Sequence, residues 1–201
     1  MKLMIATGNK HKVEEIKRIF EDIDELELLF KPDFPDLPEV DENKDTLEGN
    51  AIKKAVETAK LTGFWCLADD TGLEVDALNG EPGVYSARYA GEDATYADNN
   101  IKLLKELEHF KNRKAKFACV IALSDPQGNY KFVRGECHGR ILKELKGSKG
   151  FGYDPIFQPD GFDETFAQMN ANIKNEISHR GKALALARKE WEKIFEQLKN
   201  N

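Results

Sequence analysis

The sequence predicts an α/β protein with a mixed β-sheet, and three observations carry this prediction. Short apolar runs that suit buried strands alternate with helix-spaced apolar positions in the first half of the chain. Later, two strand-like segments flank the turn sequence SDPQGN, residues 124–129, which is typical of a β-hairpin. The 201 residues contain no repeat, low-complexity tract or flexible linker, so we expect one folding unit over 1–201 with two lobes.

The N-terminal elements are predicted as strand, helix, strand and loop. A strand over 3–6 ends at Thr7-Gly8-Asn9, and a second strand is expected over 26–30. Residues 31–45 hold three prolines and many acidic residues, which predicts a loop. The helix between the strands is indicated by apolar residues at helical spacing, namely Val13, Ile16, Ile19 or Phe20, and Ile23.

A second helix is predicted to start at Thr46 and to stop at Gly63. A strand over 64–68 then runs into two adjacent carboxylates, and residues 73–78 are expected to pair back on it. The inward-facing positions of the helix are Leu47, Ile52, Ala55, Val56 and Ala59.

The C-terminal half is predicted as helix, hairpin, glycine-rich loop and helix. The helix lies within 93–110, and the hairpin strands cover 117–123 and 130–137. The loop 147–161 includes a short apolar run, and the last helix begins near Ser178, a good N-cap. The apolar residues that define these two helices are Ile101, Leu104 and Leu107, and then Leu184, Ala187, Trp191, Ile194 or Phe195, and Leu198.

Composition and charge narrow the class of protein. The formal net charge is −6, whereas proteins that grip duplex nucleic acid usually carry a basic excess, so we expect no nucleic-acid partner. Cys66, Cys119 and Cys137 show no CxxC spacing, which predicts reduced, buried thiols. No apolar run suits a membrane span or a signal peptide, so the sequence predicts a cytoplasmic protein with no membrane partner.

The first candidate site is ATGNKHK, residues 6–12, which joins the first strand to the first helix. Backbone amides at a helix start carry partial positive charge and favour a phosphate, and Lys10 and Lys12 add full charges. The spacing is not that of a Walker A loop, GxxxxGK[ST]. The alternative is a plain connection between a strand and a helix.

The second candidate combines Glu42 with the pair Asp69-Asp70. Mg²⁺ takes oxygen ligands, typically one or two carboxylates together with phosphates and water. Successive strand residues point to opposite faces, so the two aspartates are expected to do different jobs. One of them would serve as metal ligand or general base while the other anchors the turn. The alternative is that both are turn residues at a strand end, where aspartate is common.

The third candidate is GFGYDPIF, residues 150–157. Phe151 or Tyr153 can stack on a base, and Asp154 can accept hydrogen bonds from a base edge or a ribose. Aromatic residues next to glycines more often fill a core, and that is the alternative here.

The fourth candidate is ISHRGKAL, residues 177–184. If Ser178 caps the last helix, His179 and Arg180 lie in its first turn, where cations are electrostatically disfavoured. Their presence indicates an anion to be bound or a base to be read, with Lys174 as a further donor. Solvated surface side chains are the alternative.

Together, ATGNKHK, ADDTGLEVDALNGEPGVYSARYAGEDAT, FGYDPIF and SHRGKAL resemble the inosine triphosphate pyrophosphatase family in order and approximate spacing, over nearly the whole chain. The resemblance implies an elongated, twisted mixed sheet flanked by helices, two lobes with a central substrate cleft, and a homodimer. It also implies Mg²⁺-dependent hydrolysis of ITP, dITP and XTP to the monophosphate and pyrophosphate, which cleanses the nucleotide pool.

The resemblance also implies roles for single residues. Asp70 corresponds to the catalytic carboxylate, and Glu42 with Asp70 would hold the magnesium ion. The substrate contacts that it implies are Thr7, Gly8, Asn9, Lys10, His11, Lys12, Thr71, Phe151, Gly152, Tyr153, Asp154, Lys174, His179 and Arg180.

Two positions depart from the family's pattern. Thr71 replaces a serine found in many relatives and keeps the hydroxyl. Gly49, in LEGNA, replaces a glutamate, so Glu39 or Glu48 would assist Glu42 if a further metal ligand is needed.

Base recognition follows from donor and acceptor chemistry. Donors on His179, Arg180 and Lys174 suit the 6-oxo group of hypoxanthine and xanthine and disfavour the 6-amino group of adenine.

Two other functions stay open: a pyrophosphatase for pyrimidine triphosphates, and a nucleotide-sensing module without turnover. Nucleic-acid binding ranks behind both because of the acidic balance.

Overall fold

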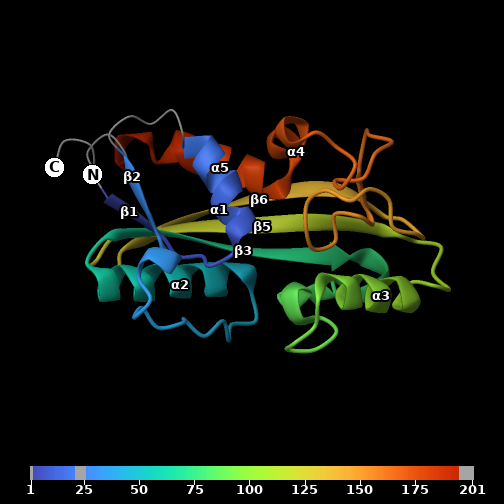
Figure 1. The fold of residues 1–201 in the computed structure, drawn as a ribbon, viewed down its shortest axis with the longest axis horizontal. Coiled ribbons are helices and arrows are strands. Elements are labelled where there is room, and N and C mark those ends of the chain that lie inside the picture. The colour runs from blue at the N-terminus through green and yellow to red at the C-terminus, as the bar shows by residue number, and fades with distance from the viewer. Residues whose placement is uncertain (1, 21–25, 195–201) are drawn as a thin grey trace. The chain divides into compact units, whose positions relative to one another are not determined.

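The computed structural model describes residues 2–20 and 26–194, which form a mixed α/β fold around one sheet (Figure 1). The sheet has seven strands in the order β2-β1-β3-β5-β6-β7, with β4 paired to β3. Its strands are β1 Lys2–Ile5, β2 Glu27–Phe30, β3 Trp65–Val75, β4 Pro82–Gly83, β5 Lys114–Ser124, β6 Tyr130–Ile141 and β7 Phe157–Pro159. Its helices are α1 Lys10–Phe20, α2 Leu47–Thr62, α3 Tyr96–Glu106, α4 Ala171–Ile177 and α5 His179–Glu190, with 3-10 turns at Lys31–Asp33, Asp76–Leu78 and Ser86–Arg88.

The sheet is mixed, as predicted. Strand β1 pairs in parallel with β2 and β3, while β3 pairs with β4 and β6 pairs with β7 in antiparallel fashion. The chain divides into two compact units. The first comprises residues 1–70, 119–135 and 181–201, and the second comprises 71–118 and 136–180. Strands β3, β5 and β6 contribute residues to both units.

Each unit has its own hydrophobic core. In the first unit, residues of β1, β3 and β5 pack against α1 and α5, with Trp191 and Ile16 fully buried. Helix α2 covers the other face of these strands through its alanines (Figure 1). In the second unit, Leu103 and Leu107 meet the aromatic residues Phe117, Phe157 and Phe166. Burial of these apolar side chains is the main driving force that fixes both units.

Helix α2 shows why the sequence marks its ends clearly. The Thr46 hydroxyl accepts a hydrogen bond from the Gly49 N–H at 3.0 Å, which caps the start. Gly63 adopts a left-handed φ of 72° and donates to the Ala59 carbonyl at 2.9 Å, which caps the end. Both predicted boundaries of this helix are confirmed.

The predicted strand that runs into the aspartates is wrong in length. Strand β3 does not stop before Asp69 but continues through both aspartates to Val75. Residues 73–75 therefore belong to the same strand rather than pairing back, and the antiparallel partner is β4, through Leu73 opposite Gly83. The carboxylates lie inside a strand because residues from other elements hold them there.

Two further differences concern helices. Ile101 is 62% exposed, because α3 buries Asn99, Asn100 and Leu103 instead. Helix α4, capped by Asn170, was not predicted. The expected helical positions Ile23, Phe195 and Leu198 lie outside the described residues.

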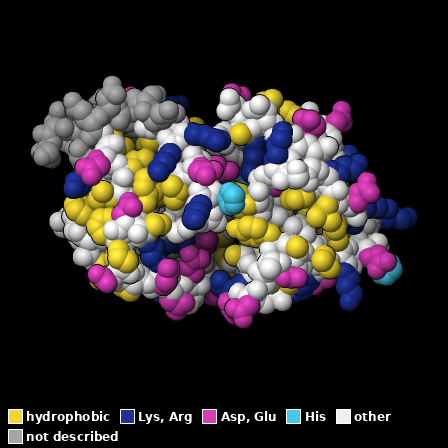
Figure 2. All heavy atoms as spheres, in the orientation of Figure 1, with side chains coloured by type: hydrophobic (Ala, Val, Ile, Leu, Met, Phe, Trp, Pro, Cys, Tyr) yellow, Lys and Arg dark blue, Asp and Glu magenta, His cyan; other side chains and the backbone are white. Residues whose placement is uncertain are grey.

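The prediction of buried, unpaired thiols is confirmed. The three cysteines are free and buried. Acidic and basic side chains are intermingled over the described part of the face in Figure 2. Among the described residues, no helix combines the length and the apolar character that crossing a membrane requires.

Candidate active site

The loop between β1 and α1 places the first candidate residues at the start of a helix. The side-chain oxygen of Asn9 accepts hydrogen bonds from the N–H groups of His11 at 3.0 Å and Lys12 at 3.4 Å. The Asn9 N–H in turn donates to the Thr7 hydroxyl at 3.2 Å. Because Asn9 already binds two amides of the first turn, anion binding at this helix start depends more on its lysine side chains than on those amides.

Lys12 belongs to a set of charged and polar residues that we call the carboxylate–lysine cluster: Lys12, Glu42, Asn50, Lys54, Asp69 and Asp70, all in the first unit. The Lys12 ammonium lies 2.9 Å from an oxygen of Asp69, whose side chain is fully buried. Lys54 forms an ion pair with Glu42 and donates to the Asp69 carbonyl at 2.9 Å. The cluster therefore links α1, the 31–45 loop and α2 to the middle of β3.

Lys54 stays charged inside this cluster. Burial alone would lower the pKa of its ammonium, but attraction to Asp69, Glu42 and Asp70 raises that pKa above its ordinary value. A positive charge is thus fixed between the carboxylates.

For Asp70, in contrast to Lys54, the effect of burial outweighs the attraction of the opposite charges. Burial raises the pKa of its carboxyl to about 6, while Lys54 and Lys12 lower it, Glu42 raises it and a hydrogen bond from Asn50 lowers it again. Asp70 is only 7% exposed. Lys12 and Lys54 interact with both aspartates, and Asp70 also accepts a hydrogen bond from Asn50.

Removing the Asp70 charge is expected to stabilise the metal-free protein above pH 6. The folded state binds the Asp70 proton more tightly than the unfolded state, so ionisation in the folded state is unfavourable and this stability is lost as pH rises through about 6. From pH 4 to pH 8, the difference in unfolding free energy between Asp70→Asn and the unmodified protein should shift by about 2–3 kcal/mol in favour of the variant. Urea denaturation in EDTA at several pH values measures it, with the exposed Asp160→Asn as control. A difference that does not change with pH would contradict the assignment.

Two residues of this cluster, Asn50 and Lys54, were not identified from the sequence. They are spaced four apart on α2 and so share one face of the helix. That spacing beside a predicted acidic site was the available signal.

The acidic residues considered as extra metal ligands are bound elsewhere in the first unit. Glu48 lies 2.7 Å from a guanidinium nitrogen of Arg134, and Glu39 pairs with Lys31. A Cβ atom at Gly49 would lie 2.8 Å from the Cβ of Lys44, so a glutamate there would require this loop to shift. Glu42 joins the 31–45 loop to the cluster through its ion pair with Lys54.

The second unit holds a separate group, the aromatic–basic cluster: Thr71, Phe151, Asp154, Lys174 and Arg180. The Arg180 guanidinium donates to the Thr71 hydroxyl at 3.2 Å and lies 5.7 Å from the centre of the Phe151 ring. The Lys174 ammonium lies 5.1 Å from the same ring. Phe151 is therefore a half-buried aromatic surface flanked by two cations, which suits stacking and hydrogen bonding to a base.

Asp154 and Tyr153 support this cluster rather than face solvent. One Asp154 oxygen accepts hydrogen bonds from the Lys174 ammonium at 2.6 Å and the Phe151 N–H at 2.8 Å. Tyr153 is 5% exposed and its hydroxyl donates to the Ser86 carbonyl at 2.9 Å, so Phe151 is the better candidate for stacking.

His179 and Arg180 are not solvated surface residues. They are 4% and 2% exposed, and the helix α5 begins at His179, directly after Ser178, as predicted. The His179 ring stacks on Phe117 with 4.5 Å between ring centres. A buried guanidinium and imidazole at a helix start require a strong local reason, which supports a role in binding an anion or a base.

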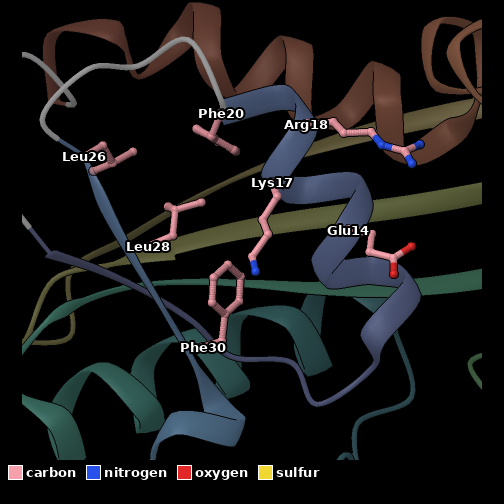
Figure 3. Close-up of a pocket in the computed structure, with 7 residues that line it drawn as sticks. All are labelled: Glu14, Lys17, Arg18, Phe20, Leu26, Leu28 and Phe30. Atoms are coloured by element: carbon pink, nitrogen blue, oxygen red, sulfur yellow. The ribbon is translucent and has the colours of Figure 1, made fainter.

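A pocket of about 620 Å³ in the first unit shares no lining residue with either cluster (Figure 3). The pocket is lined by Glu14, Lys17, Arg18, Phe20, Leu26, Leu28 and Phe30. Two of these residues interact, since the Lys17 ammonium lies 4.5 Å from the centre of the Phe30 ring. None of the candidate site residues lines it.

Comparison with known proteins places these clusters in a family context. Residues 3–190 match the model of the Ham1 family. A dITP/XTP pyrophosphatase of Flavobacterium johnsoniae is 52% identical over 185 residues, covering 92% of this chain and 94% of the relative.

Two solved structures are similar to this fold. The Ham1 protein of Staphylococcus aureus has a TM-score of 0.86 and 41% identity, with 96% of this chain and 98% of that chain covered. The nucleoside-triphosphatase / dITP/XTP pyrophosphatase of Mycobacterium abscessus has a TM-score of 0.76 and 41% identity, with 93% and 97% covered.

Proposed function

Because this chain belongs to the Ham1 family, we propose that it hydrolyses the non-canonical purine nucleoside triphosphates ITP, dITP and XTP to the monophosphate and pyrophosphate. One observation carries the proposal: relatives named dITP/XTP pyrophosphatase match this chain over nearly its full length, and the family match over residues 3–190 includes both clusters. Such an enzyme removes unwanted nucleotides from the pool before they are used.

Binding of the phosphate tail is the task that we assign to the carboxylate–lysine cluster. A nucleoside triphosphate carries about four negative charges near neutral pH, and that charge opposes attack by water unless it is neutralised. Lys12 and Lys54 hold fixed positive charge next to the carboxylates, and Lys10 and His11 are exposed at the same helix start. These side chains can take the phosphate oxygens without reorganising the fold.

Magnesium is the cofactor that we propose, held by Glu42 and Asp70. Mg²⁺ usually binds one or two carboxylates and completes its shell with substrate oxygens and water. The two side chains fit this pattern, because both interact with Lys54 and Glu42 is close enough to raise the pKa of Asp70. Within the described ranges 2–20 and 26–194, no three or more His, Cys, Asp or Glu residues are grouped so that they could hold a metal ion. When bound, the ion supplies charge neutralisation at the phosphate oxygens.

Asp70 is also our candidate general base. In the metal-free protein burial raises its pKa to about 6, so this carboxylate is more basic than an ordinary aspartate, which suits acceptance of a proton from the attacking water. Because pyrophosphate leaves, the attack is assigned to the α-phosphorus. Rigid placement within β3, rather than in a loop, keeps this carboxylate oriented.

Base selection is assigned to the aromatic–basic cluster. Phe151 offers a ring face, and Arg180 and Lys174 offer donors that suit a 6-oxo group but meet the 6-amino group of adenine donor to donor. An unpaired buried donor costs about 1–3 kcal/mol, enough for roughly a tenfold to hundredfold preference.

Arg180→Ala is expected to narrow the preference for ITP over ATP by about tenfold or more, because the variant loses one of the donors that favour the oxo group. The measurement is kcat/KM for both nucleotides by pyrophosphate release. Lys189→Ala, an exposed change in the same helix, controls for lost positive charge. An unchanged ratio in Arg180→Ala would assign base recognition to other residues.

A panel of nucleoside triphosphates with Mg²⁺ tests the function itself, with products resolved into monophosphate and pyrophosphate or diphosphate and phosphate. Faster pyrophosphate release from ITP, dITP and XTP than from ATP and GTP supports the proposal. Faster release from TTP or UTP would favour a pyrimidine enzyme, and binding without turnover would favour a sensing module.

We also propose that the chain acts in the cytoplasm as a homodimer. Light scattering coupled to size-exclusion chromatography measures the mass, and a mass of one chain would contradict the dimer.

A further inference from the structure

Helix α3 buries two adjacent asparagines, Asn99 and Asn100, each only 2% exposed. Buried amides must find hydrogen-bond partners, and both of these bind loops outside the helix. Asn99 accepts from the Ala90 N–H at 2.7 Å and donates to the Ala87 carbonyl at 3.0 Å. The amide nitrogen of Asn100 donates to the Gly152 carbonyl at 2.9 Å. The two side chains therefore fasten different loops to one helix.

The contact of Asn100 lies in the middle of the segment that forms the aromatic–basic cluster. Gly152 has a left-handed φ of 61° and stands between Phe151 and the core residue Tyr153. The orientation of the peptide that follows Gly152 depends on where its carbonyl is held, and among the described residues Asn100 is the donor found for it. Tyr96, one turn earlier on α3, places its ring 6.1 Å from that of Phe151. One helix thus supports both the backbone and the ring of this segment.

The Asn100 side chain is not optimised for stability alone. Its nitrogen donates twice, to Gly152 and to the Tyr96 carbonyl at 2.8 Å, but its buried oxygen has no hydrogen-bond partner among the described residues. A side chain selected only for packing would not leave a buried acceptor unsatisfied. Local rules are broken in this way mainly at functional sites.

We propose that Asn100 is a positioning residue for base recognition: it holds the Gly152 carbonyl so that Phe151 presents its ring between Lys174 and Arg180. Asn100 itself does not touch the substrate. The proposal rests on the proposed function, because it assigns a support to the same base-recognition cluster.

Asn100→Leu tests this role, since leucine has a similar size and no donors. The apparent KM for ITP is expected to rise about tenfold, the effect of one lost hydrogen bond, while kcat changes by less than about threefold. Affinity for inosine monophosphate, measured by calorimetry, should fall by a similar factor, and inhibition by inorganic tripolyphosphate should not change. Weaker binding of inosine monophosphate with unchanged inhibition by tripolyphosphate is expected only if the substitution disturbs recognition of the base and not of the phosphates.

Asn99→Leu is the matched control, because it removes an equally buried asparagine whose bonds go to a different loop. We expect it to alter thermal stability but neither the KM for ITP nor the affinity for inosine monophosphate. If Asn100→Leu does not fold, Asn100→Ser, which is too short to reach Gly152, replaces it with the same expectation.

Three outcomes would overturn the proposal: an unchanged KM and monophosphate affinity in the Asn100 variant, an equal loss of tripolyphosphate inhibition, or the same KM shift in Asn99→Leu. Failure of the unmodified protein to hydrolyse ITP would instead contradict the proposed function, so the two failures are distinguishable.

Discussion

Asp70→Asn is expected to lower kcat for ITP by about a thousandfold or more while the nucleotide still binds. The substitution removes one proposed magnesium ligand and the proposed general base in a single step. It leaves Lys12 and Lys54 in place, and these lysines carry the positive charge that we assign to phosphate binding. The fold should persist, because the buried charge that it removes is itself unfavourable above pH 6.

The measurement is steady-state pyrophosphate release from ITP and Mg²⁺, paired with nucleotide affinity from calorimetry. Asp160→Asn, exposed and outside both clusters, controls for the loss of a negative charge. A near-normal rate in Asp70→Asn would remove this residue from the mechanism. A variant that loses both turnover and affinity would place Asp70 in ground-state binding rather than in the chemical step.

Lys174→Met is expected to lower the unfolding free energy by about 3–5 kcal/mol, the usual result of leaving one member of a buried ion pair without its partner. Asp154 is 3% exposed, and its carboxylate lies 2.6 Å from the Lys174 ammonium. The variant removes that ammonium and leaves the buried carboxylate, which accepts a hydrogen bond from the Phe151 N–H. Urea denaturation at pH 7 measures the change.

Two variants make this test specific. The double change Lys174→Met with Asp154→Asn removes both charges and should recover a substantial part of the lost stability. Lys2→Met breaks the exposed pair with Glu27, whose side chains are 50% and 57% exposed, and should change stability by less than about 1 kcal/mol. Equal effects at the two lysines would mean that burial does not set the strength of the Lys174 pair.

Much of the fold could be predicted because its local signals agree with one another. Helix α2 carries a threonine cap at one end and a left-handed glycine at the other, and the turn at 125–129 joins β5 to β6 as a hairpin signal predicts. The end of β3 could not be predicted. Adjacent aspartates normally stop a strand, and here Lys12, Asn50 and Lys54 hold them from positions distant in the sequence.

The exposed position of Ile101 has a related cause. A prediction from helical periodicity assigns apolar side chains to the buried face of a helix, so it placed Ile101 on the buried face of α3. The structure buries Asn99 and Asn100 there, since their partners are backbone groups of two loops whose positions the sequence does not reveal.

The candidate site was predicted motif by motif, whereas its internal contacts were not. Residue types and spacing indicated Asp70, Lys12 and Arg180 as chemically useful. That Asp69 pairs with Lys12, and that Lys54 joins Glu42 to β3, depends on the packing of α1 and α2 against the sheet. The cleft between two lobes that the family resemblance implies stays a prediction.

The burial of the natural thiols has a practical consequence for experiments on this protein. Cys66 and Cys119 are inaccessible, Cys137 is 4% exposed, and burial raises the pKa of the Cys66 thiol to about 12. Alkylating dyes react with accessible thiolates, so the unmodified chain is already a silent background for labelling. One new cysteine in place of the exposed Tyr85 would accept a fluorophore without any prior removal of native thiols.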